Sequence, residues 1–250
     1  MSAERTQTER TQTERTLVTG GAGGIGLAVA AREIAAGRTV IVLDRAPPPA
    51  DLAARFIAVD MMDEAATGGA LAEALGDGPI TRLVNNVGMV RPALLDDTTS
   101  ADFAAVMRLN LGTAIQCTQA LLPGMRASGF GRIVNVSSRA AYGKELRTAY
   151  AASKAGLLGA TRTWALELGA DGITVNAVAP GPIATPLFTA ANPPDAPRTR
   201  AIIAAVPVGR MGTPDDVAEA VSFFLGAAAG FITGQTLPVC GGITVGKGTV

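Results

Sequence analysis

Short apolar runs alternate along the chain with longer segments in which apolar residues recur at helical spacing. The apolar runs have the length of strands and lie at 16–19, 39–43, 56–59, 81–88, 131–138, 173–178 and 235–239. Helical patterns lie between them, at 25–36, 63–75, 100–127 and 150–168, and another helix begins at Thr213. Such alternation is typical of a parallel sheet with right-handed crossovers. It predicts one α/β domain over 16–250: a doubly wound parallel sheet (Rossmann-like) of about seven strands with helices on both faces.

Three segments interrupt this alternation. Residues 1–15 repeat Glu-Arg-Thr-Gln-Thr without bulky apolar residues, which predicts a disordered N-terminal tail. Pro47–Pro49 leave little room for a helix between the second and third strands, so that crossover helix is expected to be very short or absent. Residues 185–207 are rich in Pro, Ala and Thr with little period, which indicates a lid over a substrate site.

The first strand runs directly into a glycine-rich turn that is followed by a helix. Glycines at 20, 21, 23, 24 and 26 permit a tight turn in which backbone N–H groups approach a pyrophosphate at the helix N-terminus. Asp44 ends the next strand, where a carboxylate accepts both ribose hydroxyls of NAD and repels the 2′-phosphate of NADP. Two alternatives stay open: Asp44 is a common turn residue, and Arg45 can hold a 2′-phosphate. Asp60 follows the third strand, where it can meet the adenine amino group.

Tyr150 and Lys154 lie four residues apart on a predicted helix, so both side chains project from one face. A nearby ammonium favours the phenolate, which brings a phenol of pKa about 10 closer to a general acid–base at neutral pH. The alternative is a half-buried tyrosine beside a solvated lysine.

Two further polar features accompany this helix. Asn110 lies inside the predicted helix 100–127 among apolar residues, where a buried amide needs a partner or a water. The strand 131–138 ends in the hydroxyls of Ser137 and Ser138 just before Tyr150.

Composition removes several classes of function. The chain of 250 residues has no histidine, which excludes histidine catalysis and histidine-ligated metal sites, and no other metal site is indicated. Its formal net charge of zero argues against a nucleic-acid or anionic-membrane surface. No apolar stretch is typical of a membrane span. Cys117 and Cys240 have neither metal-site nor disulfide spacing and are expected to be reduced, buried residues of an intracellular protein.

Together these residues resemble the single-domain short-chain dehydrogenase/reductase family over nearly all of 16–242. The motifs occur in the family's order, and they are Thr19 with Gly20, Gly24, Ile25 and Gly26, then Asn85, Asn86 and Gly88, Asn110, Ser138, Tyr150 with Lys154, Asn176, and Pro180 with Gly181. The resemblance implies that Tyr150 moves the proton, that Lys154 holds the nicotinamide ribose and lowers the pKa of Tyr150, and that Ser138 binds the substrate oxygen. Asn110 would anchor a water of a proton relay.

The resemblance also implies the cofactor contacts and the assembly. Pro180, Gly181, Ile183 and Thr185 would contact the nicotinamide side of the cofactor. The glycine-rich turn, Asn86 and Gly88 would hold the remainder of the cofactor. A cytoplasmic homotetramer is expected, since the family commonly assembles in this way, and small residues on the Tyr150 helix suit such packing. Departures from the family pattern are the spacing of Ser138 and Tyr150, which is one residue short, together with Val87 and Cys240. Ser137 would restore the usual spacing, but the strand motif favours Ser138.

Three functions are compatible with these residues. The leading prediction is an NAD-dependent dehydrogenase or ketone reductase that interconverts a secondary alcohol or diol and a ketone. The alternative is an NADPH-dependent 3-oxoacyl thioester reductase, against which Asp44 argues. A non-catalytic nucleotide-binding protein would not need the whole set of catalytic residues. Arg139 or Arg147 is a hypothetical contact for an anionic substrate group, the alternative being solvated loop charges.

Overall fold

The computed structural model describes residues 14–193 and 195–246, and their centre is a seven-stranded parallel sheet. The strand order is β3-β2-β1-β4-β5-β6-β7, and every neighbouring pair is parallel. The strands are β1 (Arg15–Thr19), β2 (Thr39–Asp44), β3 (Arg55–Ala58), β4 (Arg82–Asn85), β5 (Gly131–Val136), β6 (Ile173–Pro180) and β7 (Thr236–Val239). The predicted fold class is confirmed.

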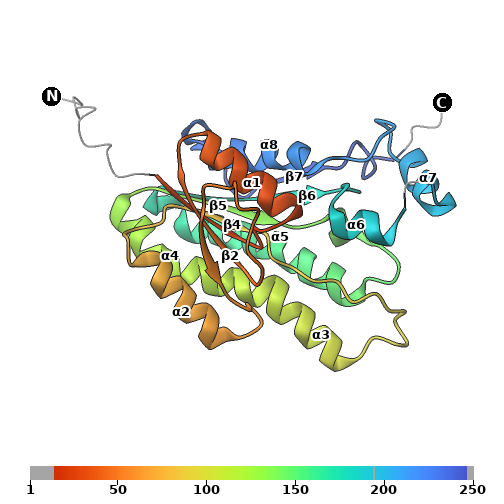
Figure 1. Cartoon of the computed structure of the whole chain (residues 1–250), viewed down its shortest axis with the longest axis horizontal. Helices are drawn as coiled ribbons and strands as arrows, with labels where there is room; N and C mark the ends of the chain where they lie inside the picture. Colours follow the sequence, from red (N-terminus) through yellow and green to blue (C-terminus); the bar gives the residue numbers. More distant parts are fainter. Residues whose placement is uncertain (1–13, 194, 247–250) are drawn as a thin grey trace.

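Helices cover both faces of the sheet (Figure 1). One layer holds α1 (Gly24–Ala35) and α8 (Pro214–Leu225), which pack against each other. The opposite layer holds α2 (Glu64–Leu75), α3 (Ser100–Met107), α4 (Thr113–Ser128) and α5 (Thr148–Leu168). Two short helices, α6 (Pro186–Ala191) and α7 (Pro197–Ala204), lie beyond the end of β6. Among the described residues, no helix has the length and apolarity that crossing a bilayer requires.

The alternation of side chains along the central strands builds two separate cores. Leu17 and Ile41 belong to a cluster on the face covered by α2 and α4, whereas their neighbours Val18 and Val42 pack with α1 and α8. Strands covered on both faces consist of continuous apolar residues, as these do. Each fully buried aliphatic side chain contributes about 1.5–3 kcal/mol relative to exposure. The sheet is therefore a rigid platform for the polar residues at its carboxyl edge.

The predicted helical stretch 100–127 is helical throughout, but it is not one regular α-helix. A π-helical turn, Arg108–Gly112, separates α3 from α4 and carries Asn110. π-turns inside helices occur frequently at functional sites because they displace one residue from the regular helical face.

The structure agrees with some of the predictions for the three segments that interrupt the alternation and differs from others. The crossover 45–54 contains no helix, as predicted. The segment 185–207 contains α6 and α7, each begun by a proline at its first turn, although its sequence shows little period. Residues 1–13 of the predicted tail lie outside the described residues. Its last residue, Arg15, is instead buried in β1, and Glu14 forms ion pairs with Arg38 and Arg82 at 3.1 and 2.9 Å.

Candidate active site

The strand order reverses direction beside β1, because the chain moves outward from β1 to β3 and then returns to place β4 on the other side. Ligands of doubly wound sheets bind at the carboxyl ends of the strands at such a switch point. The glycine-rich turn follows β1 here, and Asn86 follows β4.

Close contacts within the glycine-rich turn leave no room for a side chain at Gly26. Gly20 and Gly24 have φ values of 65° and 53°, in the left-handed region that favours glycine. A Cβ atom at Gly26 would overlap the carbonyl oxygen of Gly20 and lie 2.6 Å from Nδ2 of Asn86. Asn86 donates from Nδ2 to the carbonyls of Thr19 and Gly20 at 3.0 and 2.9 Å. The turn therefore fits a pyrophosphate at the N-terminus of α1.

Thr19 is a residue of this turn whose role the sequence does not reveal. Its hydroxyl donates to the carbonyl of Val84 and accepts from the backbone N–H groups of Asn86 and Val87. The hydroxyl thus joins the ends of β1 and β4. The sequence places Thr19 at a strand end and in the family motif, but it does not indicate this bridging role.

The carboxylate of Asp44 is turned toward the glycine-rich turn. Its Oδ2 accepts from the backbone N–H of Ala22 at 3.0 Å, and its Oδ1 accepts from that of Arg45 at 2.7 Å. The side chain of Arg45 is exposed. A negative charge therefore lies beside the turn at the end of β2, where an adenosine ribose would lie when its pyrophosphate occupies the turn.

Tyr150 and Lys154 lie one turn apart near the start of α5. The Nζ atom of Lys154 is 5.8 Å from the centroid of the Tyr150 ring and donates to the carbonyl of Val136 at 2.7 Å. The side chain of Lys154 is buried, whereas Tyr150 is partly exposed. The pair thus faces the end of β5.

The two serines that end β5 have different surroundings. Ser137 is buried and donates to the carbonyl of Lys154 at 2.8 Å, so its hydroxyl fastens β5 to α5. Ser138 is partly exposed, lowers the pKa of the Tyr150 phenol, and accepts from the N–H of Ala140 at 3.1 Å. This geometry supports Ser138, rather than Ser137, as the hydroxyl available to a substrate.

Asn110 has the buried partners that its position requires. Its Nδ2 donates to the Met89 carbonyl at 3.0 Å and to Oγ of Ser153 at 2.9 Å, and its Oδ1 accepts from the Met89 N–H at 2.8 Å. Both amide hydrogens are therefore used within the protein, so a relay water would need Oδ1 or the main-chain carbonyl. The water-anchoring role stays a prediction.

Three effects set the pKa of Tyr150. Burial of the phenol raises this pKa, while the hydrogen bond with Ser138 and the positive charge of Arg147 lower it. The pKa of Tyr150 is raised on balance, and the charge that lowers it is that of Arg147, not that of Lys154 as the sequence predicts. Burial also lowers the pKa of Lys154 to about 8. Lys154 is thus poised to change its charge in mildly alkaline solution.

The buried ammonium of Lys154 is expected to reduce stability at neutral pH. A folded-state pKa of about 8 against 10.5 in the unfolded chain corresponds to about 3 kcal/mol of destabilisation below pH 8. The unfolded state binds more protons between these values, so stability rises as pH increases from 8 to 10.5. We expect Lys154→Met to stabilise the fold at pH 7, and the gain to shrink at pH 10. Urea unfolding at both pH values measures this, and a variant less stable than wild type at pH 7 would contradict it.

A cavity of about 220 Å³ brings most of the predicted site residues together. It is lined by Ser138, Tyr150 and Lys154 and by the predicted cofactor contacts Ile25, Asn86, Gly88, Pro180, Gly181, Ile183 and Thr185. Asn110 does not line the cavity but supports it through Met89. Asp60 lies apart from it, exposed, and accepts from the N–H of Met62, so its adenine contact stays a prediction. Phe188 of α6, within the predicted lid segment 185–207, also lines the cavity, and so does Val90, which the sequence did not indicate.

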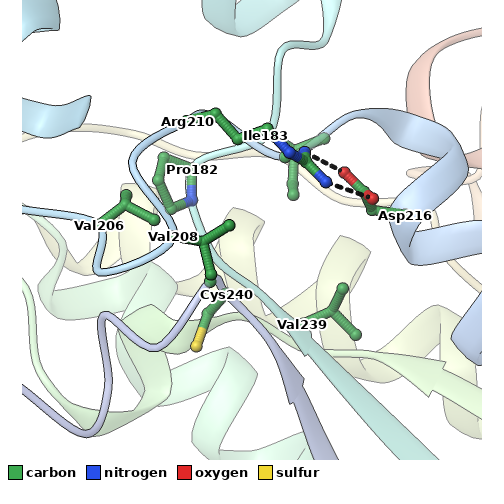
Figure 2. Close-up of a pocket in the computed structure, with 10 residues that line it drawn as sticks. Pro182, Ile183, Val206, Val208, Arg210, Asp216, Val239 and Cys240 are labelled. Carbon is green, nitrogen blue, oxygen red and sulfur yellow. Dashed lines mark hydrogen bonds and ion pairs between the residues drawn. The ribbon is translucent and has the colours of Figure 1, made fainter.

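A second cavity, of about 210 Å³, shares Ile183 with the first (Figure 2). Arg210 lines it and forms a two-point ion pair with Asp216, at 2.6 and 2.9 Å, and Cys240 also lines it. Gly212 donates to the Pro182 carbonyl and accepts from the N–H of Ala184. These contacts hold the segment 182–185 in place for the first cavity. Cys117 and Cys240 are free and buried, as predicted.

Comparisons with known proteins agree with this architecture. The family model described as enoyl-(acyl carrier protein) reductase matches residues 20–244. The (2S)-[(R)-hydroxy(phenyl)methyl]succinyl-CoA dehydrogenase subunit BbsD of Thauera aromatica is 38% identical, covering 90% of this chain and 94% of that protein. The acetoacetyl-CoA reductase of Shinella zoogloeoides is 39% identical, covering 90% and 96%. A putative 2-deoxy-d-gluconate 3-dehydrogenase from Agrobacterium tumefaciens, with bound NADP, is 35% identical with a TM-score of 0.86, covering 93% and 96%.

The fold and the comparisons define an oxidoreductase of the doubly wound, nicotinamide-dinucleotide class. The chain belongs to the short-chain dehydrogenase/reductase family. The resemblance seen in the sequence motifs is thereby confirmed.

Proposed function

We propose that this protein is an NAD(H)-dependent oxidoreductase that interconverts a secondary alcohol or diol and a ketone. The orientation of the Asp44 carboxylate toward the glycine-rich turn is the observation that carries the choice of NAD. A bound NAD ribose has two hydroxyls to donate to a carboxylate, whereas the 2′-phosphate of NADP would be repelled. Reduction of NAD by secondary alcohols tests the proposal.

The residues of the cavity supply position and proton transfer. The nicotinamide, when bound, supplies or accepts the hydride. Ser138 holds the substrate oxygen and Tyr150 gives a proton to it in reduction or takes one in oxidation. Lys154 holds the nicotinamide ribose, and the 180–185 segment holds the ring side of the cofactor. Asn110 fixes the Met89 backbone beside the reacting centre. Because these groups line one cavity, they hold the substrate and the cofactor in a reactive orientation. Such positioning lowers the activation barrier of the hydride transfer.

A second candidate is reduction of a 3-oxoacyl thioester with NADPH. The names of relatives favour it, because they include acetoacetyl-CoA reductases and the 3-oxoacyl-[acyl-carrier-protein] reductase FabG of Thermotoga maritima. Structures of relatives with bound NADP point the same way. The position of Asp44 argues against NADPH here, so the cofactor preference separates the two candidates.

Substitution of Asp44 tests that preference. We expect Asp44→Ala to lower kcat/KM for NAD by about 10–100-fold, because a charge-assisted hydrogen bond contributes about 1.5–3 kcal/mol. The kcat/KM for NADP should rise, since the carboxylate that repels the 2′-phosphate is removed. Asp51→Ala, which removes an exposed carboxylate from the same crossover, is the matched control. Steady-state kinetics with both cofactors measure the change. A wild-type enzyme that prefers NADP would overturn the role of Asp44.

We also propose that the chain assembles as a homotetramer in the cytoplasm. Ala152, Ala155 and Gly159 leave an exposed strip of small residues on α5, which suits close helix packing between subunits. Phe231 and Leu237, before and within the edge strand β7, are exposed apolar residues that an assembly would cover. Light scattering during gel filtration tests the mass, and a monomer at micromolar concentration would contradict it.

A further inference from the structure

An ion pair that lies outside the first cavity is connected to one of its walls. Arg210, in the loop between α7 and α8, donates from Nη1 and Nη2 to the two carboxylate oxygens of Asp216, at 2.6 and 2.9 Å (Figure 2). Asp216 belongs to the first turn of α8. Neither side chain lines the cavity that contains Tyr150 and Lys154. Any effect of this pair on the site must therefore pass through the residues between them.

The carboxylate of Asp216 binds both ends of the short segment 210–213. Besides accepting from Arg210, its Oδ2 accepts from the backbone N–H of Thr213 at 2.7 Å. The hydrogen bonds from Arg210 and Thr213 lower the pKa of this carboxyl, so it stays ionised throughout the neutral pH range. Helix α8 packs against α1 and the sheet, which gives Asp216 a fixed base. We call these contacts of 210–213 with Asp216 the clamp, and Gly212 lies within it.

Gly212 connects the clamp to the wall of the first cavity through the main chain. Its N–H donates to the carbonyl of Pro182 at 3.0 Å, and its carbonyl accepts from the N–H of Ala184 at 2.8 Å. Gly212 and Ile183 thus form an isolated β-bridge. The fit is close, because a Cβ atom at Gly212 would lie 2.5 Å from Cδ1 of Ile183. A movement of Gly212 would therefore displace Ile183.

Side-chain packing gives the segment 182–185 incomplete support. The second cavity, of about 210 Å³, adjoins Pro182 and Ile183, so side chains do not pack continuously against them there. Ile183 and Thr185 also line the first cavity. A segment that borders two cavities has fewer neighbouring atoms to fix its position than one in a close-packed core. The position of 182–185 therefore depends on the bridge to Gly212.

We propose that the clamp positions the nicotinamide half of the cofactor, because Arg210 and Asp216 fix the place at which Ile183 and Thr185 meet it. This inference rests on the proposed binding of NAD(H) in the first cavity. Arg210 and Asp216 are positioning residues, since they act through the bridge. The adenosine half would lie beside Asp44 and the glycine-rich turn, whose hydrogen bonds do not involve the clamp. The clamp should therefore affect the two halves of the cofactor differently.

Binding of NADH and of ADP-ribose, which lacks the nicotinamide, tests this difference. We expect Arg210→Gln to weaken NADH binding about 10-fold, the equivalent of about one hydrogen bond, and to leave ADP-ribose binding unchanged. Isothermal titration calorimetry measures both affinities. An equal loss for the two ligands would contradict the proposal, because it would indicate lost long-range attraction between the arginine and the phosphates. Unchanged binding of NADH would contradict it as well.

The control variant separates the clamp from a general effect of removing an exposed ion pair. Arg126→Gln removes a similarly exposed arginine, which pairs with Asp171 at 2.8 Å before the amino ends of β5 and β6. It should keep the wild-type affinity for NADH. Exposed ion pairs contribute little to stability, and Arg210→Gln keeps Thr213 and Asp216, which form the capping box of α8. Thermal unfolding should therefore give both variants nearly the wild-type melting temperature.

A second variant reaches the bridge without changing the ion pair. The methyl group of Gly212→Ala would press on Cδ1 of Ile183, so we expect the same selective loss of NADH binding. On a verified substrate, the rate of hydride transfer in a single turnover should fall about 10-fold in Arg210→Gln, because small displacements of the reacting groups slow such reactions. A wild-type rate in this variant would contradict positioning of the nicotinamide.

These measurements keep the clamp separate from the proposed reaction. Selective loss of NADH in Arg210→Gln, in a protein that oxidises no alcohol, would support the clamp and refute the reaction. Equal NADH affinity in wild type and Arg210→Gln, in a protein that does oxidise alcohols, would refute the clamp alone. If wild type binds NADPH instead, NADPH and 2′-phospho-ADP-ribose replace the two ligands, so the outcome does not depend on the role of Asp44.

Discussion

Replacing Tyr150 by phenylalanine is expected to lower kcat by about 10²–10⁴-fold, the usual contribution of a positioned general acid–base. The substitution removes only the phenol hydroxyl and keeps the ring, whose centroid lies 5.8 Å from Nζ of Lys154. Cofactor affinity should therefore change little, and the loss should appear in kcat rather than in the binding of NADH. Stopped-flow measurement of a single turnover separates these two effects.

Tyr142 provides the matched control. It is the other tyrosine of the chain, lies in the same β5–α5 loop region, and is exposed, so Tyr142→Phe should turn over like wild type. The pH profile gives a second check, because wild-type oxidation should increase with deprotonation of Tyr150 and the variant should lack that dependence. Turnover of Tyr150→Phe within threefold of wild type on a verified substrate would show that another group moves the proton.

Replacing Gly26 by alanine is expected to weaken NAD(H) binding by about 10²-fold or more. The new methyl group would overlap the Gly20 carbonyl and crowd Nδ2 of Asn86, so the turn itself must move. A displacement of about 1 Å at such a site can cost about 10²-fold, and overpacking adds about 1–3 kcal/mol of destabilisation. Isothermal titration with NADH and thermal unfolding measure the two effects.

Gly23 offers the same substitution without the same crowding. No heavy atom lies within 4 Å of a Cβ built there, and its φ of −156° is extended backbone that any residue adopts. Gly23→Ala should therefore keep the wild-type melting temperature and bind NADH far better than Gly26→Ala. Equal affinity in the two variants would mean that the turn between β1 and α1 does not hold the cofactor.

Much of the fold could be predicted from local patterns. Continuous apolar runs place β1, β2 and β5 between two helical layers, and the switch between Leu17 and Val18 already assigns their side chains to opposite faces. Thr213 with Asp216 forms the capping box that begins α8, as the Thr-Pro-Asp-Asp sequence indicates. Local chemistry also indicated the glycine-rich turn, because only glycine tolerates its backbone angles and close contacts.

The features that escaped prediction depend on contacts between distant segments. Asn110, in the π-helical turn, hydrogen-bonds Met89 and Ser153, which are distant in the sequence. The local sequence pattern does not predict such contacts. Burial likewise reversed the simple expectation for Tyr150, whose pKa it raises. The residue types indicated the chemistry of these groups, but their burial and their partners could be known only from the structure.

The initial rate of reduction of NAD and of NADP by a panel of secondary alcohols, diols and hydroxy acids tests the central claim most directly. The account predicts formation of NADH by wild type with at least one member of the panel, a kcat/KM for NAD well above that for NADP, and loss of the reaction in Tyr150→Phe. A wild-type enzyme that binds NADH yet oxidises none of these alcohols and reduces none of the matching ketones, or that reacts with NADP in preference to NAD, would contradict it.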